Sequence, residues 1–279
     1  MRLSRRAAAA ALLLTVGSPS SAQELPEALR PTFEEGVRAL RAGKLDAAEA
    51  AFQRVLEQGG RVAYVHNNLG LVYQERGQHK PAVAQFREAI RLDPAYGAPR
   101  LALGASLLAL DQVGEATVQL EQAAKLLPRE PLARLQLARA YERAGKWTGA
   151  VEQYRALKRL APREPEYAYQ LGKAYLRLSE WSLRQLREID PRSARLEQAL
   201  GHNYRVQGRN DQALRAFERA ALADPTLPEV HLALAQIHIE LKNWEDARKE
   251  IDRELAIVPE SAGARALLQR LQAEEAKSP

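Results

Sequence analysis

The stretch NLGLVYQERGQHKPAVAQFREAIRLDP, residues 68–94, decides the fold of this chain. Leu69 and Tyr73 lie four residues apart and therefore share one face of a first helix. Gly77 stands where that helix must end, because glycine adopts the left-handed conformation at little cost. A second helix follows, with apolar residues at intervals of four and three, and Asp93-Pro94 ends it because proline cannot continue a helix. The stretch predicts two antiparallel helices.

The same pattern returns along the chain. A small residue marks each first helix, at Gly36, Gly70, Gly104, Ala138, Gly172, Gly201 and Ala235. A proline marks the end of most units, at Pro94, Pro128, Pro162, Pro191, Pro225 and Pro259. Both series advance by 34 residues, and each contains one interval of 29, after residue 172 and after residue 162. A unit that cannot bury its apolar face alone must stack on copies of itself, so the chain is predicted to be an array of helix pairs.

These residues resemble the motif of the tetratricopeptide repeat. The alanine of the second helix stands at Ala48, Ala82, Ala116, Ala150, Ala213 and Ala247, and four residues later comes Phe52, Phe86, Leu120, Tyr154, Phe217 or Ile251. The tryptophan of the motif is absent, and His66 and His231 stand in its place. The resemblance covers residues 29–260 in seven units. It implies an all-α fold, a right-handed α-solenoid closed by a C-terminal capping helix.

The repeats and their flanks predict six segments. They are a signal peptide (1–22), a linker (23–28), repeats one to four (29–162), a shortened repeat five (163–191), repeats six and seven (192–260), and a capping helix with a tail (261–279).

The interval of 29 residues removes the turn of repeat five. Between Gly172 and Pro191 there is no glycine or proline, and apolar residues continue at helical spacing through the junction. We therefore expect one long helix from about Glu166 to Ile189. The alternative is a tight turn at 178–180, with Ser182 and Gln185 resembling a capping box.

The N-terminus has the three parts of a secretory signal: a basic start, an apolar run from Ala7 to Val16, and small residues before a cleavage site after Ala22. The apolar run is too short to span a bilayer of about 30 Å. The mature chain is therefore expected to be periplasmic or secreted, with no membrane span. An uncleaved anchor, a misplaced start and a twin-arginine signal at Arg5-Arg6 are the alternatives.

Composition argues against several classes of protein. The formal net charge is +6, but Arg2, Arg5 and Arg6 account for half of it, which is too mild for a nucleic-acid partner. There is no cysteine, no histidine pair with metal-ligand spacing, and no nucleophile or phosphate-binding motif. We expect no catalytic residue, no cofactor and no metal, and therefore no enzyme.

The resemblance implies that first helices line a concave groove, which receives an extended peptide or a helix of a protein partner. The repeat register places these residues on it: Tyr64, Asn67, Leu71, Gln136, Arg139, Arg143, Tyr169, Lys173, Arg177, Arg195, His202 and Arg205. The positive bias of repeats four to six favours a partner with an acidic segment, and the alternative is that these arginines only solubilise the helices. The carboxylate clamp of the family is not carried over, because Phe33, Val37, Ala98 and Ala102 stand where its polar residues belong.

The predicted function is a protein-protein interaction scaffold without catalysis. The alternatives are an assembly factor of a cell-envelope machine (pilus, secretion or polysaccharide export) and an accessory subunit of an envelope enzyme.

Overall fold

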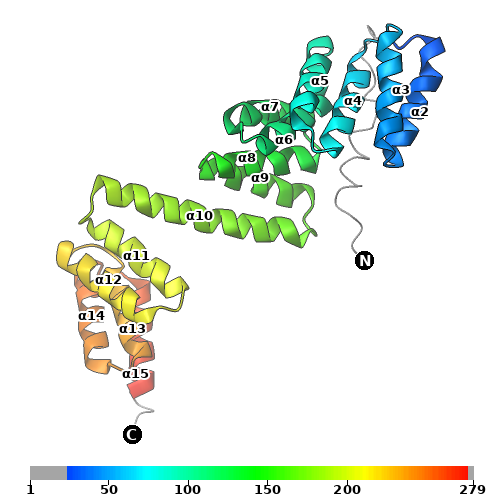
Figure 1. The fold of residues 1–279 in the computed structure, drawn as a ribbon. Helices are drawn as coiled ribbons and strands as arrows, with labels where there is room; N and C mark the ends of the chain where they lie inside the picture. Colours follow the sequence, from blue (N-terminus) through cyan, green and yellow to red (C-terminus); the bar gives the residue numbers. More distant parts are fainter. Residues whose placement is uncertain (1–23, 276–279) are drawn as a thin grey trace. The chain divides into compact units, whose positions relative to one another are not determined.

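The structure is a computed structural model that describes residues 24–275 of the 279. The predicted signal peptide and the residues from 276 on lie outside the described residues. Within the described range all regular structure is helical: a short 3-10 helix, η1 (Glu27–Leu29), and fourteen α-helices (Figure 1). The predicted all-α fold is confirmed.

The chain divides into two compact units, Met1–Leu178 and Ser179–Pro279, called here the upstream and the downstream unit. The upstream unit contains four helix pairs: α2 (Arg30–Arg41) with α3 (Leu45–Glu57), α4 (Ala63–Glu75) with α5 (His79–Leu92), α6 (Gly97–Ala109) with α7 (Val113–Leu126), and α8 (Pro131–Arg143) with α9 (Trp147–Leu160). Each pair packs on the next, and one continuous apolar core runs from Leu25 to Ala140.

The downstream unit contains two pairs and a final helix. They are α11 (Ala194–Val206) with α12 (Asn210–Ala223), α13 (Val230–Glu240) with α14 (Trp244–Ile257), and α15 (Ala262–Glu275). Helix α15 buries Leu267 and Leu271 against Ile239 and Ile251, while its other side stays polar. It therefore ends the stack in the way that a capping helix does.

The glycine of several first helices has a packing reason. A β-carbon placed on Gly70 would lie 2.6 Å from the ring of Phe86, and one placed on Gly201 would lie 2.7 Å from the ring of Phe217. Contacts this short do not occur between real side chains, so glycine allows the bulky residue of the second helix to fill the space beside the first. Phe86 and Phe217 are fully buried as a result.

One residue with a positive φ forms the turn within each complete pair. Glycine occupies four of these turns with φ between 69° and 72°, at Gly43, Gly77, Gly145 and Gly208. Asp111 (φ 62°) and Lys242 (φ 60°) hold the same position in the other two pairs, although they lack the freedom of glycine. The predicted role of Gly77 is confirmed.

Repeat five is a single helix, α10 (Pro165–Ile189), of 25 residues. Residues 178–180 are helical, so the expected long helix is confirmed and the tight turn is not formed. The boundary between the two units falls within it, after Leu178. In the upstream unit, Tyr167, Leu171 and Ala174 pack against the buried residues of α8 and α9.

Candidate functional site

The first helices of the repeats, α2, α4, α6 and α8, form one face of the upstream unit, which is called here the first-helix face. Tyr64 on α4 is the first of the predicted residues on this face. Its ring meets that of Phe33 edge to face, with centroids 5.0 Å apart. Its hydroxyl accepts a hydrogen bond from the backbone N–H of Leu25 at 3.2 Å. Burial is the main cause of a raised pKa at Tyr64, which keeps the hydroxyl neutral. An extended piece of this chain, before η1, is thus held at the face through its backbone.

Asn67 lies one turn further along α4 and is completely buried. Neither its Nδ2 nor its Oδ1 has a hydrogen-bond partner in the described part of the chain. Leu71, one turn beyond, is 5% exposed. The predicted outward orientation of Asn67 and Leu71 is therefore wrong: both side chains are buried in a row along α4, because α4 packs against the first helices on either side, α2 and α6. Gln74, the next residue of the row, bonds to Ala102 O and Ser106 Oγ of α6.

Helix α8 supplies three of the predicted residues. Gln136 is half-buried and Arg139 is exposed. Arg143 is bonded to the backbone oxygen of Leu108 and to the carboxylate of Asp111. Arg143 therefore ties repeat four to the turn of repeat three and does not serve as a free cation.

Helix α10 carries three more of the predicted groove residues within the upstream unit. Tyr169 is 62% exposed, and the ammonium of Lys173 lies 5.8 Å from the centre of its ring. Arg177 is also exposed.

The remaining predicted residues belong to the downstream unit. Arg195 donates to Gln198 Oε1 at 3.2 Å, and exposed His202 places its ring edge to face with Phe217. Arg205 forms a two-pronged ion pair with Glu240, at 3.2 and 3.0 Å. The predicted basic residues thus divide between the two units, and Arg205, like Arg143, is bound to an acidic neighbour.

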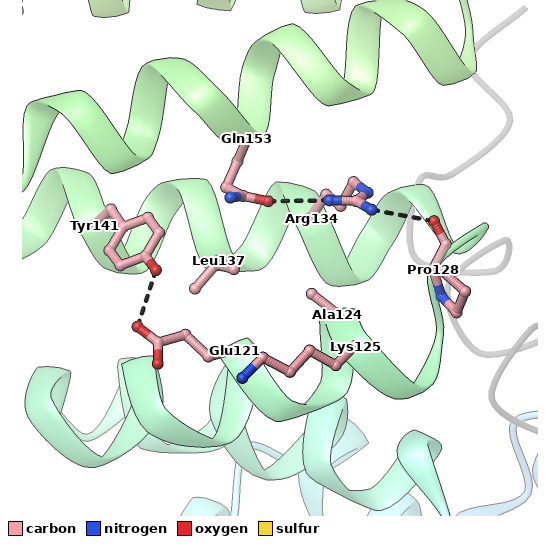
Figure 2. Close-up of a pocket in the computed structure, with 8 residues that line it drawn as sticks. All are labelled: Glu121, Ala124, Lys125, Pro128, Arg134, Leu137, Tyr141 and Gln153. Carbon is pink, nitrogen blue, oxygen red and sulfur yellow. Dashed lines mark hydrogen bonds between the residues drawn. The ribbon is translucent and has the colours of Figure 1, made fainter.

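A pocket of about 540 Å³ lies among α7, α8 and α9 (Figure 2). The hydroxyl of Tyr141 donates to Glu121 Oε1 at 2.9 Å, and Arg134 donates to Gln153 Oε1 at 3.3 Å and to Pro128 O at 3.4 Å. Burial, followed by the bond to Glu121, raises the pKa of Tyr141 to about 12. The polar groups that line the pocket are therefore largely paired with one another.

The pairing of Arg134 with Gln153 was not predicted from the sequence, although it belongs to a pattern that repeats along the chain. The residue at the tryptophan position of the motif bonds to a polar residue 19 positions later in four repeats: His66–Gln85, Arg100–Gln119, Arg134–Gln153 and His231–Glu250. In three of them it also reaches the backbone oxygen of the preceding proline, at Pro94, Pro128 and Pro225. A polar bridge between helices replaces the packing of an indole ring.

Residues 24–275 contain no cluster of three or more His, Asp or Glu side chains that could hold a metal ion. His66 and His231 are buried and bonded within the helix pairs. Over the same residues, no helix combines the length and the apolar character that a membrane crossing requires.

Two family models, both described as tetratricopeptide repeat, match the chain. One matches residues 204–271, and the other matches residues 33–97, 101–165 and 135–182. No curated protein matches the sequence significantly.

Several solved structures are similar to the chain at low sequence identity. A tetratricopeptide repeat protein from Parabacteroides merdae is 12% identical, with 88% of this chain and 99% of that chain covered and a TM-score of 0.50. Pseudomonas aeruginosa pilF is 18% identical, with 89% and 98% covered and a TM-score of 0.48. The APC/C hetero-tetramer Cut9-Hcn1 gives 20% identity and a TM-score of 0.44, with 87% of this chain but only 42% of that chain covered. The family models together match well over half of the residues, and the chain belongs to the tetratricopeptide repeat family.

Proposed function

We propose that this chain is an exported, non-catalytic scaffold that binds an extended peptide or helix of a protein partner along the first-helix face of the upstream unit. The fold is that of a protein-interaction scaffold, since stacked helix repeats create extended binding surfaces. The single observation that carries the proposal is the amide of Asn67, which is fully buried on α4 and has no hydrogen-bond partner among the described residues.

A buried amide without partners is costly. An unsatisfied buried donor or acceptor destabilises a folded protein by about 1–3 kcal/mol. Asn67 presents one of each, side by side, because its side chain ends in both NH₂ and C=O. A peptide backbone offers the complementary acceptor and donor. Because Asn67 is completely buried in the unliganded fold, an extended ligand would have to open the packing around this part of α4 to satisfy both groups, and the two hydrogen bonds would then recover this cost on binding.

Tyr64 supports an extended ligand at this face. Its hydroxyl already accepts a hydrogen bond from a backbone N–H, that of Leu25. Cleavage after Ala22 would make Gln23 the first residue of the mature chain, so the row beyond Tyr64 would be left to a partner. Sequencing the N-terminus of the mature protein tests this step, and any first residue other than Gln23 contradicts the assigned cleavage site.

The exposed charges of the upstream unit indicate which kind of peptide it would bind. Arg139 and Lys173 are exposed in the upstream unit, on the first helix of repeat four and the first half of α10. Two cations on this part of the unit favour a ligand with an acidic segment, and the attraction should weaken as salt is added because exposed charges are screened.

A selection from a random peptide library with the purified protein tests the function. We expect peptides with acidic residues, and we expect Asn67→Leu to reduce their affinity at least about tenfold, because a pair of buried hydrogen bonds is lost. Asn203→Leu, at a partly buried asparagine on α11 of the downstream unit, is the control and should leave the affinity unchanged. Failure to select any peptide, or equal binding by Asn67→Leu, would show that this face is not the binding surface.

A further inference from the structure

Gly172 differs from the other glycines of its series. A β-carbon placed on Gly36, Gly70 or Gly201 would collide with the ring of a second-helix phenylalanine, but one placed on Gly172 has nothing within 4 Å. Gly172 and the neighbouring Tyr175 are exposed, and Tyr175 is 46% exposed. The first half of α10 thus keeps the face that receives a second helix, and no helix among residues 24–275 covers it.

The second half of α10 keeps the positions that a second helix normally buries against its first helix. Counting back from Pro191 as from Pro94, the positions of Ala82, Phe86 and Ala89 correspond to Ser179, Leu183 and Leu186. Ala82, Phe86 and Ala89 of α5 are 0% exposed. In α10, Ser179 is exposed, and Leu183 and Leu186 are only partly buried.

The two features form one stripe. Steps of three and four residues place six side chains on one side of α10, at Ala168, Gly172, Tyr175, Ser179, Leu183 and Leu186. None of the seven charged residues of this helix belongs to the stripe. The uncharged stripe resembles the interior of a helix pair, in which small residues of one helix face large residues of the other.

We propose that this stripe of α10 binds the same stripe of a second copy of the chain, as an antiparallel helix pair. Gly172 of one copy then receives Leu183 of the other, Tyr175 lies beside Ser179, and Ala168 lies beside Leu186. Each contact occurs twice, because the first half of each helix meets the second half of its partner, as a two-fold axis requires. Repeat five would be completed between two chains.

The shortened interval of 29 residues explains why the two halves of α10 do not pair with each other within one chain. The complete pairs turn at a residue with a positive φ, such as Gly77, and α10 lacks the residues for this turn. Shortening a hinge prevents a hairpin from closing on itself and favours exchange of the same element between copies. The halves of α10 retain the surfaces of a helix pair, and only another copy offers both surfaces in the reversed order.

The molar mass of the purified protein, measured by sedimentation over a range of concentrations, tests the proposal. We expect a dimer, and we expect Gly172→Leu to convert it to a monomer, because the added side chain occupies the space of Leu183. The substitution should not unfold the chain, since the site is open and leucine favours helix. Gly114→Leu, at another open and exposed helical glycine, is the control and should remain a dimer. A monomeric parent protein, or a dimer that survives Gly172→Leu, overturns the proposal.

Crosslinking tests the antiparallel alignment. The chain contains no cysteine, so Gly172→Cys and Leu183→Cys can be made separately. Equivalent cysteines of one variant would lie about 16 Å apart along the helix pair, since they are eleven residues from their contact partners. A short bismaleimide should therefore join the two variants after they are mixed and have exchanged subunits, and should join neither alone. Crosslinking within one variant alone, or no crosslinking in the mixture, contradicts the alignment.

Discussion

The imidazole of His231 lies 2.6 Å from the carboxylate of Glu250, measured from Nδ1 to Oε2, and both side chains are buried in the downstream unit. The second ring nitrogen lies 3.2 Å from Pro225 O, and Arg253 donates to the other oxygen of Glu250 at 2.6 Å. This bridge between α13 and α14 has its counterpart in His66 and Gln85 of the upstream unit, but here the partner is a carboxylate.

The bridge makes the stability of the downstream unit depend on pH. The hydrogen bond with Glu250 raises the pKa of His231, against the opposing effect of burial. Because the folded value exceeds the ordinary 6.5, this stabilisation is complete below about 6.5 and is lost as the pH rises through the folded value. Thermal unfolding midpoints of the parent and of His231→Gln should converge as the pH rises. An identical pH dependence in both proteins would contradict the assignment.

Gly70→Ala should destabilise the upstream unit by about 1–3 kcal/mol, because a methyl group would be forced against the buried ring of Phe86. Gly114→Ala, where no atom lies within 4 Å, should be neutral or stabilise by up to about 1 kcal/mol through helix propensity. Urea unfolding of the two variants measures the difference. Equal stabilities would mean that close packing does not explain the glycine series.

Lys242→Gly should stabilise the downstream unit by about 1 kcal/mol, since Lys242 has a φ of 60° and a β-carbon is unfavourable there. The reverse change, Gly208→Lys at a φ of 71° in the preceding turn, should cost a similar amount. Unfolding midpoints in urea provide the test, and a loss of stability in Lys242→Gly would show that the lysine side chain has an unrecognised role.

Arg139 and Arg143 lie one turn apart on α8 and should behave differently. Arg143→Ser should lower the stability of the upstream unit by about 0.5–1.5 kcal/mol, because it removes a partly buried bond to Leu108 O and a solvent-exposed ion pair with Asp111. Arg139→Ser should change stability by less than about 0.5 kcal/mol, as surface substitutions do, and should weaken the binding of an acidic peptide. A reversed pattern in melting and binding assays would exclude the proposed roles.

Much of the fold could be predicted from the sequence, because each repeat states the same pattern again. The glycine series located the first helices, the prolines ended the second ones, and the single interval of 29 residues predicted α10. These features depend on neighbours within one helix pair, which periodic spacing encodes directly.

The site was less predictable, because helix register tells which face a residue occupies but not what lies opposite. Asn67 and Leu71 proved to be buried, and Arg143 and Arg205 proved to hold acidic neighbours in adjacent repeats. The bridges from the tryptophan position were missed because any single pair of polar residues 19 positions apart resembles ordinary surface residues. Only the recurring interval of 19 residues, at Arg100–Gln119 and Arg134–Gln153 for example, distinguishes them.

The side-chain amide of Asn67 provides the most direct test of the binding function. In protein labelled with ¹⁵N-asparagine, its NH₂ signals can be assigned by their loss in Asn67→Leu and followed while a selected peptide is added. We expect these signals to shift as the protein is saturated with peptide, because the peptide backbone becomes the missing hydrogen-bond partner. Signals that stay unchanged while the peptide binds would contradict it.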